Sequence, residues 1–338
     1  MGGGCDSDGT GSAAARACVA VARWVPVVFV VAVLAWAYYA YVYQLTLLTV
    51  EPAALQVLYL VVFHILLFLF VSSYYQTIFT PLRRPPDEFY LTRECQEELS
   101  AVSEDSDHCE VLARFVTLQS LPIRTKAFEG GIRYCLKCKC IKPDRSHHCS
   151  ICSQCVLKFD HHCPWVNTCV SFHNYKYFLL FLGYGFTLCL WGAITDLPYF
   201  IHFWQHDIGQ GGRVLMGQFH VVFLFFVSAM FCASLGCLFF YHLYLTARNR
   251  TTLESFRPPL FSHGPDKKAY DVGVSSNYRQ VFGTRPLYWP LPLYSTLGDG
   301  LRFPNRDTVT RRGAESASLL RVEEEEDEED EVFVRLHV

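Results

Sequence analysis

The chain has 338 residues, of which 51% are hydrophobic, 15% aromatic and only 18% charged, and its mean hydropathy is positive. This composition is too apolar for an ordinary soluble domain, and it excludes a disordered or coiled-coil protein. The formal net charge is -3, with an acidic run at 323–331 and basic residues in the middle of the chain. That distribution argues against a general nucleic-acid-binding protein.

Four apolar segments recur along the chain, at 24–48, 55–79, 177–197 and 219–245. Each is long enough to cross a bilayer, which takes about 20 apolar residues. The first segment is too long for the apolar region of a signal peptide, and no small-residue cleavage site follows it. The sequence therefore predicts an all-α polytopic membrane protein with four transmembrane helices.

Basic residues lie beside the four segments on one side only. They are Arg16 and Arg23 before the first, Arg83 and Arg84 after the second, Lys176 before the third, and Arg248 and Arg250 after the fourth. Between the paired segments the only basic residue is Arg213. The positive-inside rule then places both termini and the long 83–176 segment in the cytosol, where thiols stay reduced.

Cysteine and histidine are concentrated between Cys135 and Cys169, where eight of the fifteen cysteines occur. Repeated Cys-x2-Cys spacing favours tetrahedral zinc, because a tight turn aims both thiolates at one ion. The numbers fit two Cys3His sites, whose ligands would be Cys135, Cys138, Cys149, Cys152, Cys155, Cys169, His148 and His162. We expect short hairpins that depend on the metal for folding.

Four residues of this segment remain outside that ligand count: Cys140, Cys163, His147 and His161. Cys163 lies close to Asp160 and His161, and these three side chains are the components of an activated thiol. A neighbouring imidazole lowers the pKa of a thiol, and a carboxylate holds the imidazole in the required tautomer. The alternative is that Cys163 is a further zinc ligand or a spare thiol.

The run Asp160-His161-His162-Cys163, followed by Pro164-Trp165-Val166-Asn167, resembles the DHHC protein S-acyltransferases, or palmitoyltransferases. The run also lies within a cysteine pattern like that of the family, and between the second and third spans as in that family. After the fourth span, Thr251-Thr252-Leu253-Glu254 resembles the family's TTxE motif, and 277–283 resembles its C-terminal element. The resemblance covers most of the chain, and it is strongest to the vertebrate subgroup of members two, fifteen and twenty.

The resemblance implies a ping-pong transfer of a long-chain acyl group from acyl-coenzyme A to cysteines of cytosolic or membrane-associated proteins. Cys163 would be the nucleophile, His161 the general base and Asp160 the partner that orients it. The family's ligand pattern assigns one zinc to Cys135, Cys138, His148 and Cys155, and the other to Cys149, Cys152, His162 and Cys169. Ser171 departs from the family's usual glycine, which makes the backbone of that loop a point to examine.

The chain is expected to divide into seven parts: a cytosolic N-terminus (1–23), the first two spans (24–82), a cytosolic linker (83–132), the zinc domain (133–176), the last two spans (177–246), a C-terminal element (247–304) and a disordered acidic tail (305–338). No internal repeat is evident. The family subgroup implies Golgi or plasma membrane.

Several further residues carry expectations. Basic residues at the cytosolic interface are candidates for coenzyme A phosphates: Arg145, Lys158, Lys176, Arg248 and Arg250. In the spans, His64 is expected to be hydrogen-bonded within the bundle and Asp196 to reach water. Ala37 and Leu188 are expected near the closed end of an acyl cavity. The competing interpretation is a catalytically silent membrane scaffold, whereas a channel or transporter would need more polar spans.

Overall fold

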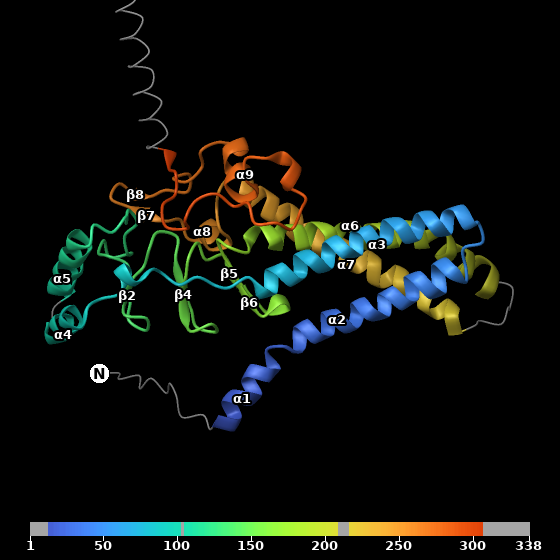
Figure 1. Cartoon of the computed structure of the whole chain (residues 1–338), viewed down its shortest axis with the longest axis horizontal. Coiled ribbons are helices and arrows are strands. Elements are labelled where there is room, and N and C mark those ends of the chain that lie inside the picture. The colour runs from blue at the N-terminus through green and yellow to red at the C-terminus, as the bar shows by residue number, and fades with distance from the viewer. Residues whose placement is uncertain (1–12, 103–104, 209–215, 307–338) are drawn as a thin grey trace, which may run out of the picture.

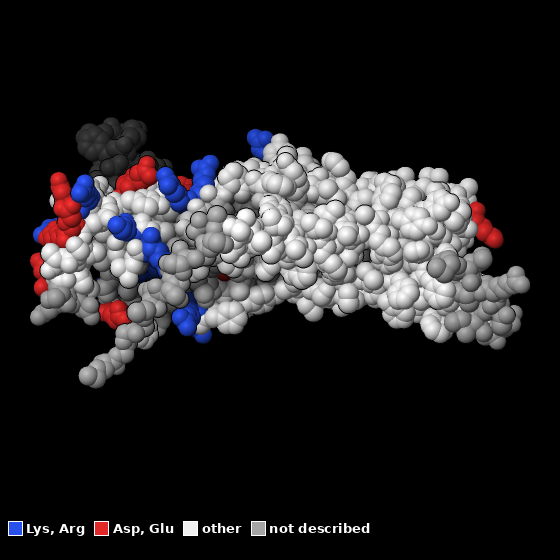
Figure 2. All heavy atoms as spheres, turned by 90° about the horizontal axis from the view of Figure 1, so that it is seen from below, with Lys and Arg blue, Asp and Glu red and all other residues white. Residues whose placement is uncertain are grey.

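The protein is described by a computed structural model covering residues 13–102, 105–208 and 216–306. The acidic run at 323–331 lies outside the described residues, as does most of the expected tail. The molecule is elongated, with a bundle of long helices at one end and short hairpins with two small helices at the other (Figure 1). Charged side chains gather at the hairpin end, whereas the visible surface of the bundle is almost free of them (Figure 2).

Four helices are long and apolar enough to cross a membrane, which confirms the predicted fold class. They span Ala17–Leu47, Ala53–Phe79, Tyr175–Gln205 and Gly217–Ala247. The elements that build them are α1 (Ala13–Ala22), α2 (Val25–Tyr38), the π-helix η1 (Tyr39–Leu47), α3 (Ala53–Phe79), α6 (Tyr175–His202), η4 (Phe203–Ile208) and α7 (Met216–Ala247). The first helical span begins before Trp24 because the alanine-rich α1 leads into it.

Small residues let the helices of the bundle approach closely. A Cβ atom on Gly183 of α6 would lie 2.9 Å from the ring of Phe239 in α7. In the reverse direction, a Cβ on Gly236 of α7 would lie 3.0 Å from the ring of Phe186. Each glycine therefore accommodates an aromatic ring of the facing helix, which is how membrane helices gain packing without a hydrophobic driving force.

Between the second and third spans the chain forms three antiparallel hairpins. They comprise β1 (Tyr134–Cys135) with β2 (Cys140–Ile141), β3 (His147–Cys149) with β4 (Gln154–Val156), and β5 (His161–Cys163) with β6 (Thr168–Val170). A 3-10 turn, η3 (Pro164–Val166), joins the last pair. Before the hairpins lie η2 (Asp87–Phe89), α4 (Arg93–Ala101) and α5 (Asp105–Leu118).

The three hairpins are copies of one structural unit, which corrects the expectation that the chain has no internal repeat. Their first cysteines are Cys135, Cys149 and Cys163, spaced at 14 residues, and pair with positions that share the same spacing. Each turn also has a left-handed residue at the equivalent place, namely Lys139, Ser153 and Asn167. The sequence carries a trace of this repeat, because His147-His148-Cys149 recurs 14 residues later as His161-His162-Cys163, while the turn residues differ in type and share one backbone conformation.

After the fourth span the chain folds back over the hairpins and the near end of the bundle (Figure 1). Its elements are α8 (Thr252–Phe256), β7 (Leu260–Phe261), β8 (Gly264–Pro265), α9 (Val274–Phe282) and η5 (Pro286–Tyr288). A capping box starts α8: Thr251 accepts from the amide of Glu254, and the Glu254 carboxylate accepts from the amide of Thr251. Val281 and Phe282 of α9 are buried in the same apolar core as the spans.

Candidate functional site

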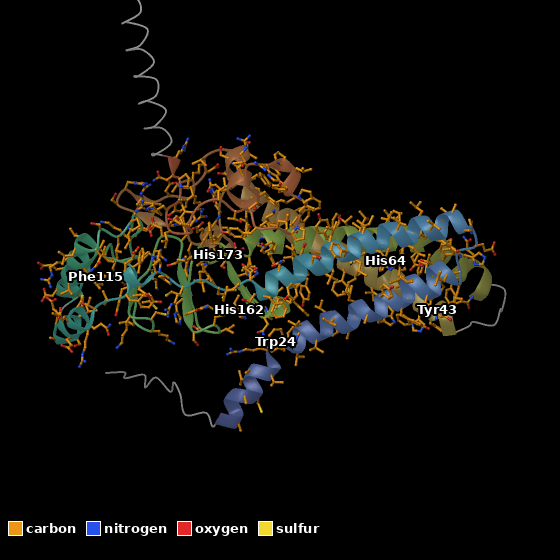
Figure 3. All side chains as sticks on the ribbon, in the orientation of Figure 1. Trp24, Tyr43, His64, Phe115, His162 and His173 are labelled. Carbon is orange, nitrogen blue, oxygen red and sulfur yellow. The ribbon has the colours of Figure 1, made fainter. Side chains whose placement is uncertain are left out.

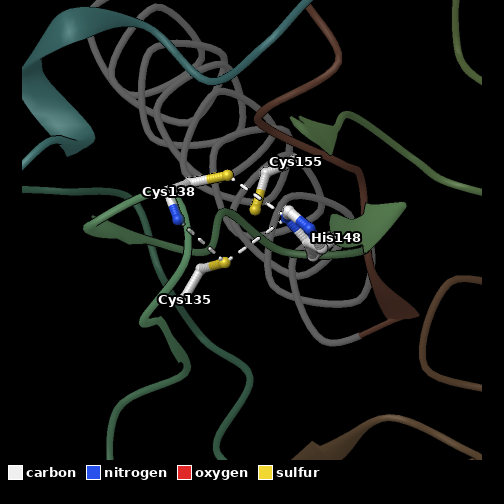
Figure 4. Close-up of side chains that lie close together, drawn as sticks. All are labelled: Cys135, Cys138, His148 and Cys155. Carbon is white, nitrogen blue, oxygen red and sulfur yellow. Dashed lines mark hydrogen bonds between the residues drawn. The ribbon is translucent and has the colours of Figure 1, made fainter. Parts of the chain in front are cut away.

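The first two hairpins bring together one group of four possible metal ligands, Cys135, Cys138, His148 and Cys155, whose ligand atoms all lie within 4.8 Å of one another (Figure 4). The Nδ1 atom of His148 is 3.2 Å from Sγ of Cys138 and 3.6 Å from Sγ of Cys135. Ligands of a tetrahedral zinc ion with Zn–S near 2.3 Å and Zn–N near 2.0 Å are about 3.5 Å apart. The donor set and its spacing therefore fit zinc.

A second group repeats the arrangement one hairpin further along. It consists of Cys149, Cys152, His162 and Cys169, again within 4.8 Å of one another. Nδ1 of His162 lies 3.4 Å from Sγ of Cys152 and 3.7 Å from Sγ of Cys149 and of Cys169. The two groups match the division that the family resemblance implies. Figure 3 shows His162 near the start of the bundle.

Cys163 belongs to neither group, although it occupies the position in the third hairpin that a ligand occupies in the other two. The second cysteine of the motif is replaced there by Val166, so the third hairpin has no Cys-x2-Cys pair. Cys163 is buried and packs in the apolar core that it shares with Val166 and Phe178. Its thiol thus lies where the hairpins meet the membrane-spanning helices.

The His161 imidazole is bonded to Asp160 and interacts with the Cys163 thiol. Its Nδ1 atom is 2.7 Å from Oδ2 of Asp160. Burial lowers the pKa of His161, but the interactions with Asp160 and Cys163 outweigh burial and raise that pKa to about 9. The three side chains are arranged as an acid, an imidazole and a thiol in sequence, as an activated nucleophile requires.

Asp160 is held in place from the far end of the chain. The backbone N–H of Thr252 donates to Oδ1 at 2.8 Å, and its hydroxyl donates to Oδ2 at 2.7 Å. Burial raises the pKa of Asp160, but the bonds to His161 and Thr252 lower it below its ordinary value. The carboxylate therefore stays charged and orients the imidazole, and α8 of the TTxE motif positions that carboxylate.

His242 and Tyr175 also adjoin the site, and the sequence did not single them out. The ring of His242, from α7, lies 5.8 Å from that of His161. The hydroxyl of Tyr175, at the start of α6, lies 3.2 Å from Nδ1 of His242. Asp160, His161 and His242 could together offer three atoms to a metal ion, but two of these residues already form the triad. A histidine in an apolar span was the one available signal.

Arg145, expected to meet coenzyme A phosphates, is instead buried in a structural network. Its guanidinium donates to both carboxylate oxygens of Glu254, at 2.8 and 2.7 Å, and to the side chain and backbone of Asn249, both at 2.9 Å. With its side chain fully buried, Arg145 cannot reach a soluble ligand. It ties the turn before the second hairpin to α8.

Two other basic candidates are also buried. The Lys176 ammonium donates to the carbonyl oxygens of Tyr288 and Leu293, and Lys158 is buried among aromatic rings. Both expectations of phosphate contact are therefore wrong for this conformation. Arg248 and Arg250 remain partly exposed at the end of the fourth span.

Three further polar residues that carried expectations are His64, Asp196 and Ser171, and one of the expectations is wrong. His64 is bonded to Tyr38 and to the carbonyl of Leu60, as expected for a bundle residue. Asp196 is fully buried, and neither carboxylate oxygen has a hydrogen-bond partner among the described residues, which corrects the expectation that it reaches water. Ser171 has no left-handed backbone, so its replacement of a glycine introduces no strain there.

Comparison with known proteins agrees with this geometry. A family model described as DHHC palmitoyltransferase matches residues 129–258. The chain is 49% identical to the human palmitoyltransferase ZDHHC2 over 88% of this chain and 79% of that protein. It is 50% identical to human ZDHHC20 over 86% of this chain and 79% of that protein, and 43% identical to ZDHHC15 of Xenopus laevis over 86% and 84%.

Proposed function

The chain belongs to the DHHC palmitoyltransferase family, and from that premise we propose that Cys163 carries the acyl group between acyl-coenzyme A and a protein cysteine. Protein S-palmitoylation is the activity of the family. The observation that carries the assignment of Cys163 is the chain of contacts from Asp160 through His161 to a thiol left free by both ligand groups.

The first step forms the acyl-enzyme. His161 accepts the proton of the Cys163 thiol, and the thiolate attacks the carbonyl carbon of the acyl-coenzyme A thioester. The bond to the coenzyme A sulfur breaks, and that thiolate takes the proton from the His161 imidazolium. Asp160, charged and fixed by Thr252, keeps Nε2 of the imidazole directed at the thiol.

The second step reverses the roles. The thiol of a substrate protein gives its proton to His161 and attacks the thioester on Cys163. The new thioester forms on the substrate, and the Cys163 thiolate recovers a proton from the imidazolium. Each step transfers one acyl group and one proton, so the enzyme returns to its starting state.

The acyl chain belongs among the spans because exposing it to water costs about 0.8 kcal/mol for each methylene. Cys163 shares one apolar core with residues deep in the bundle, and Leu188 is a buried member of that core. Ala37 packs against the same core from the first span. One turn beyond Ala37, the buried Tyr41 bonds to Thr195 across the bundle at 3.1 Å. We infer that the chain of the acyl group ends near these residues.

The two ligand groups would each hold one zinc ion. A bound ion would supply cross-linking between hairpins whose strands are only two or three residues long. Cys135, Cys138, His148 and Cys155 would hold the first, and Cys149, Cys152, His162 and Cys169 the second. Strand β5 carries both His162, a ligand of the second group, and Cys163. A zinc ion bound by the second group would therefore hold in place the strand that presents the nucleophile.

The protein is a multi-pass membrane protein, and we place both termini and the hairpins in the cytosol because basic residues flank the spans on that side. The subgroup resemblance favours the Golgi or plasma membrane. Its partners would be fatty acyl-coenzyme A, cysteine-containing proteins and bilayer lipid. The sevenfold division of the chain made above remains a proposal.

Labelling with an alkyne-bearing palmitate tests the acyl-enzyme directly. Purified wild type should carry a label that hydroxylamine removes, Cys163→Ser should carry none, and His161→Ala should acquire it slowly. Cys140→Ser is the matched control, since Cys140 is a buried thiol of the first hairpin outside both ligand groups. Equal labelling of Cys163→Ser and wild type would place the label elsewhere and favour the silent-scaffold alternative.

A further inference from the structure

Residues 286–294, named here the proline-rich segment, expose a run of large apolar side chains. The sequence is Pro-Leu-Tyr-Trp-Pro-Leu-Pro-Leu-Tyr. Leu287 is 79% exposed, Leu293 53% and Tyr294 52%. The segment contains none of the residues assigned to acyl transfer or to zinc, and contiguous exposed apolar surface of this kind marks a contact with a protein or a membrane.

The proline-rich segment is fastened to the third span. Lys176, in the first turn of α6, donates to the carbonyl oxygens of Tyr288 and Leu293 at 2.7 and 2.9 Å. Further along the same helix, the hydroxyl of Tyr184 donates to the carbonyl of Pro290. Lys176 and Tyr184 are separated by about 12 Å along the helix axis at 1.5 Å per residue. The segment therefore runs beside the first two turns of a membrane span, next to α9 (Figure 1).

Most backbone polar groups of this segment are hydrogen-bonded within the protein, as an environment without water requires. In hydrocarbon, an unpaired backbone N–H costs several kcal/mol, so irregular chain is excluded unless its polar groups are paired. Here the prolines have no N–H to pair. Of the six amides in the segment, the four of Tyr288, Trp289, Leu291 and Leu293 donate to backbone carbonyls within the segment or just before it. The span supplies donors to three carbonyl groups through side chains, as described above.

One face of the segment is fixed to the protein. The Trp289 indole N–H donates to the carbonyl of Gly283 at 3.0 Å, and its ring packs on Phe282 and Tyr278 of α9. Leu287, Leu291 and Leu293 remain exposed. Because the segment is bonded along the start of the membrane-spanning helix α6, a bilayer is the partner that these leucines match in chemistry and position.

We propose that the proline-rich segment is an interfacial loop that inserts Leu287, Leu291 and Leu293 into the bilayer leaflet on the hairpin side. The insertion fixes the height of α9 against the membrane. Gln280 of α9 accepts from Asn249, which is bonded to Arg145, so this height is transmitted to the network around α8.

Photo-crosslinking in a bilayer tests the insertion independently of activity. A diazirine amino acid replaces Leu287 or Leu293 in the full chain, which is reconstituted in phosphatidylcholine nanodiscs and irradiated. The control position is Phe128, which is 97% exposed in the loop before the hairpins. We expect lipid adducts by mass spectrometry at a severalfold higher yield from positions 287 and 293 than from 128. Equal yields would overturn the proposal, as would adducts to an added substrate protein in place of lipid.

Charge substitution provides a second measurement. In a chain with the diazirine at position 291, Leu287→Asp with Leu293→Asp should reduce the lipid adducts severalfold and slow acyl transfer. The control is Leu118→Asp, which changes a leucine that is 76% exposed on α5 and should alter neither quantity. Undiminished lipid adducts at position 291 in the double variant would refute insertion by these side chains.

Discussion

Glu254→Gln tests the buried ion pair that connects the C-terminal element to the site. The substitution removes one charge and introduces a glutamine, which a capping box also accepts at this position, so the start of α8 is preserved. Arg145 then remains fully buried without a counter-charge, and removing one partner of a buried pair costs about 3–5 kcal/mol. The guanidinium donates two hydrogen bonds to Glu254 and two to Asn249, and the side chains of Arg145 and Glu254 are only 0% and 7% exposed, so the pair is a buried one.

Hydrogen exchange at the amide of Thr252 measures this loss locally, since that N–H donates to Asp160. At about 1.4 kcal/mol for each factor of ten, exchange should accelerate between about 100-fold and a few thousand-fold. Acyl-enzyme formation should slow as well, because Asp160 loses its positioning. Adding Arg145→Met should recover part of the protection, since no unpaired charge remains.

An exposed ion pair supplies the control for this experiment. Arg93 and Glu97 of α4 form a contact of 3.0 Å with side chains that are 93% and 67% exposed. Glu97→Gln should change local stability by less than about 0.5 kcal/mol. Exchange at Thr252 that is unaltered by Glu254→Gln would refute the positioning role of the buried pair. So would a double variant that is no better protected than the single one.

Four further outcomes are expected. Cys163→Ser should retain two zinc ions per chain by metal analysis while losing the acyl label, and loss of zinc would show that Cys163 is a ligand. His148→Ala should lose one ion and unfold the hairpins, detected by proteolysis. Asp160→Asn should lower the pKa of His161, because the carboxylate bond helps to raise it to about 9, so the acid limb of the pH profile for acyl-enzyme formation should move to lower pH. Gly283→Ala should destabilise the proline-rich segment by about 1 kcal/mol or more in thermal melts, because φ is +87° and an added Cβ would lie 2.6 Å from a backbone oxygen.

Local patterns were sufficient for several features of this protein. Membrane spans follow from the length of apolar segments, and all four appear in the structure. The Cys-x2-Cys spacing predicts which thiols pair, because a tight turn directs both at one point independently of the rest of the fold. The family resemblance supplied the division of the ligands into two groups. The adjacency of Asp160, His161 and Cys163 in the chain already restricted the nucleophile to one hairpin.

Other features depend on segments that are far apart in the sequence. The partners of Asp160 and Arg145 lie in α8, some hundred positions along, and no local pattern specifies such a contact. Burial is decided in the same way: Arg145 and Lys176 are basic residues at an interface by sequence, yet the fold encloses both. His242 joins the site only because α7 packs against α6 beside the third hairpin.

The division between sequence and fold is clearest in the three hairpins. Composition and spacing predicted metal ligands beside membrane spans and a reactive cysteine among them. Only the tertiary structure showed that Cys163 occupies a ligand position in a third copy of the hairpin and that two groups of four other side chains converge without it. The physical reason is that side-chain identity sets which atoms can bind or react, whereas packing between distant segments sets which of them are brought together, enclosed or left free.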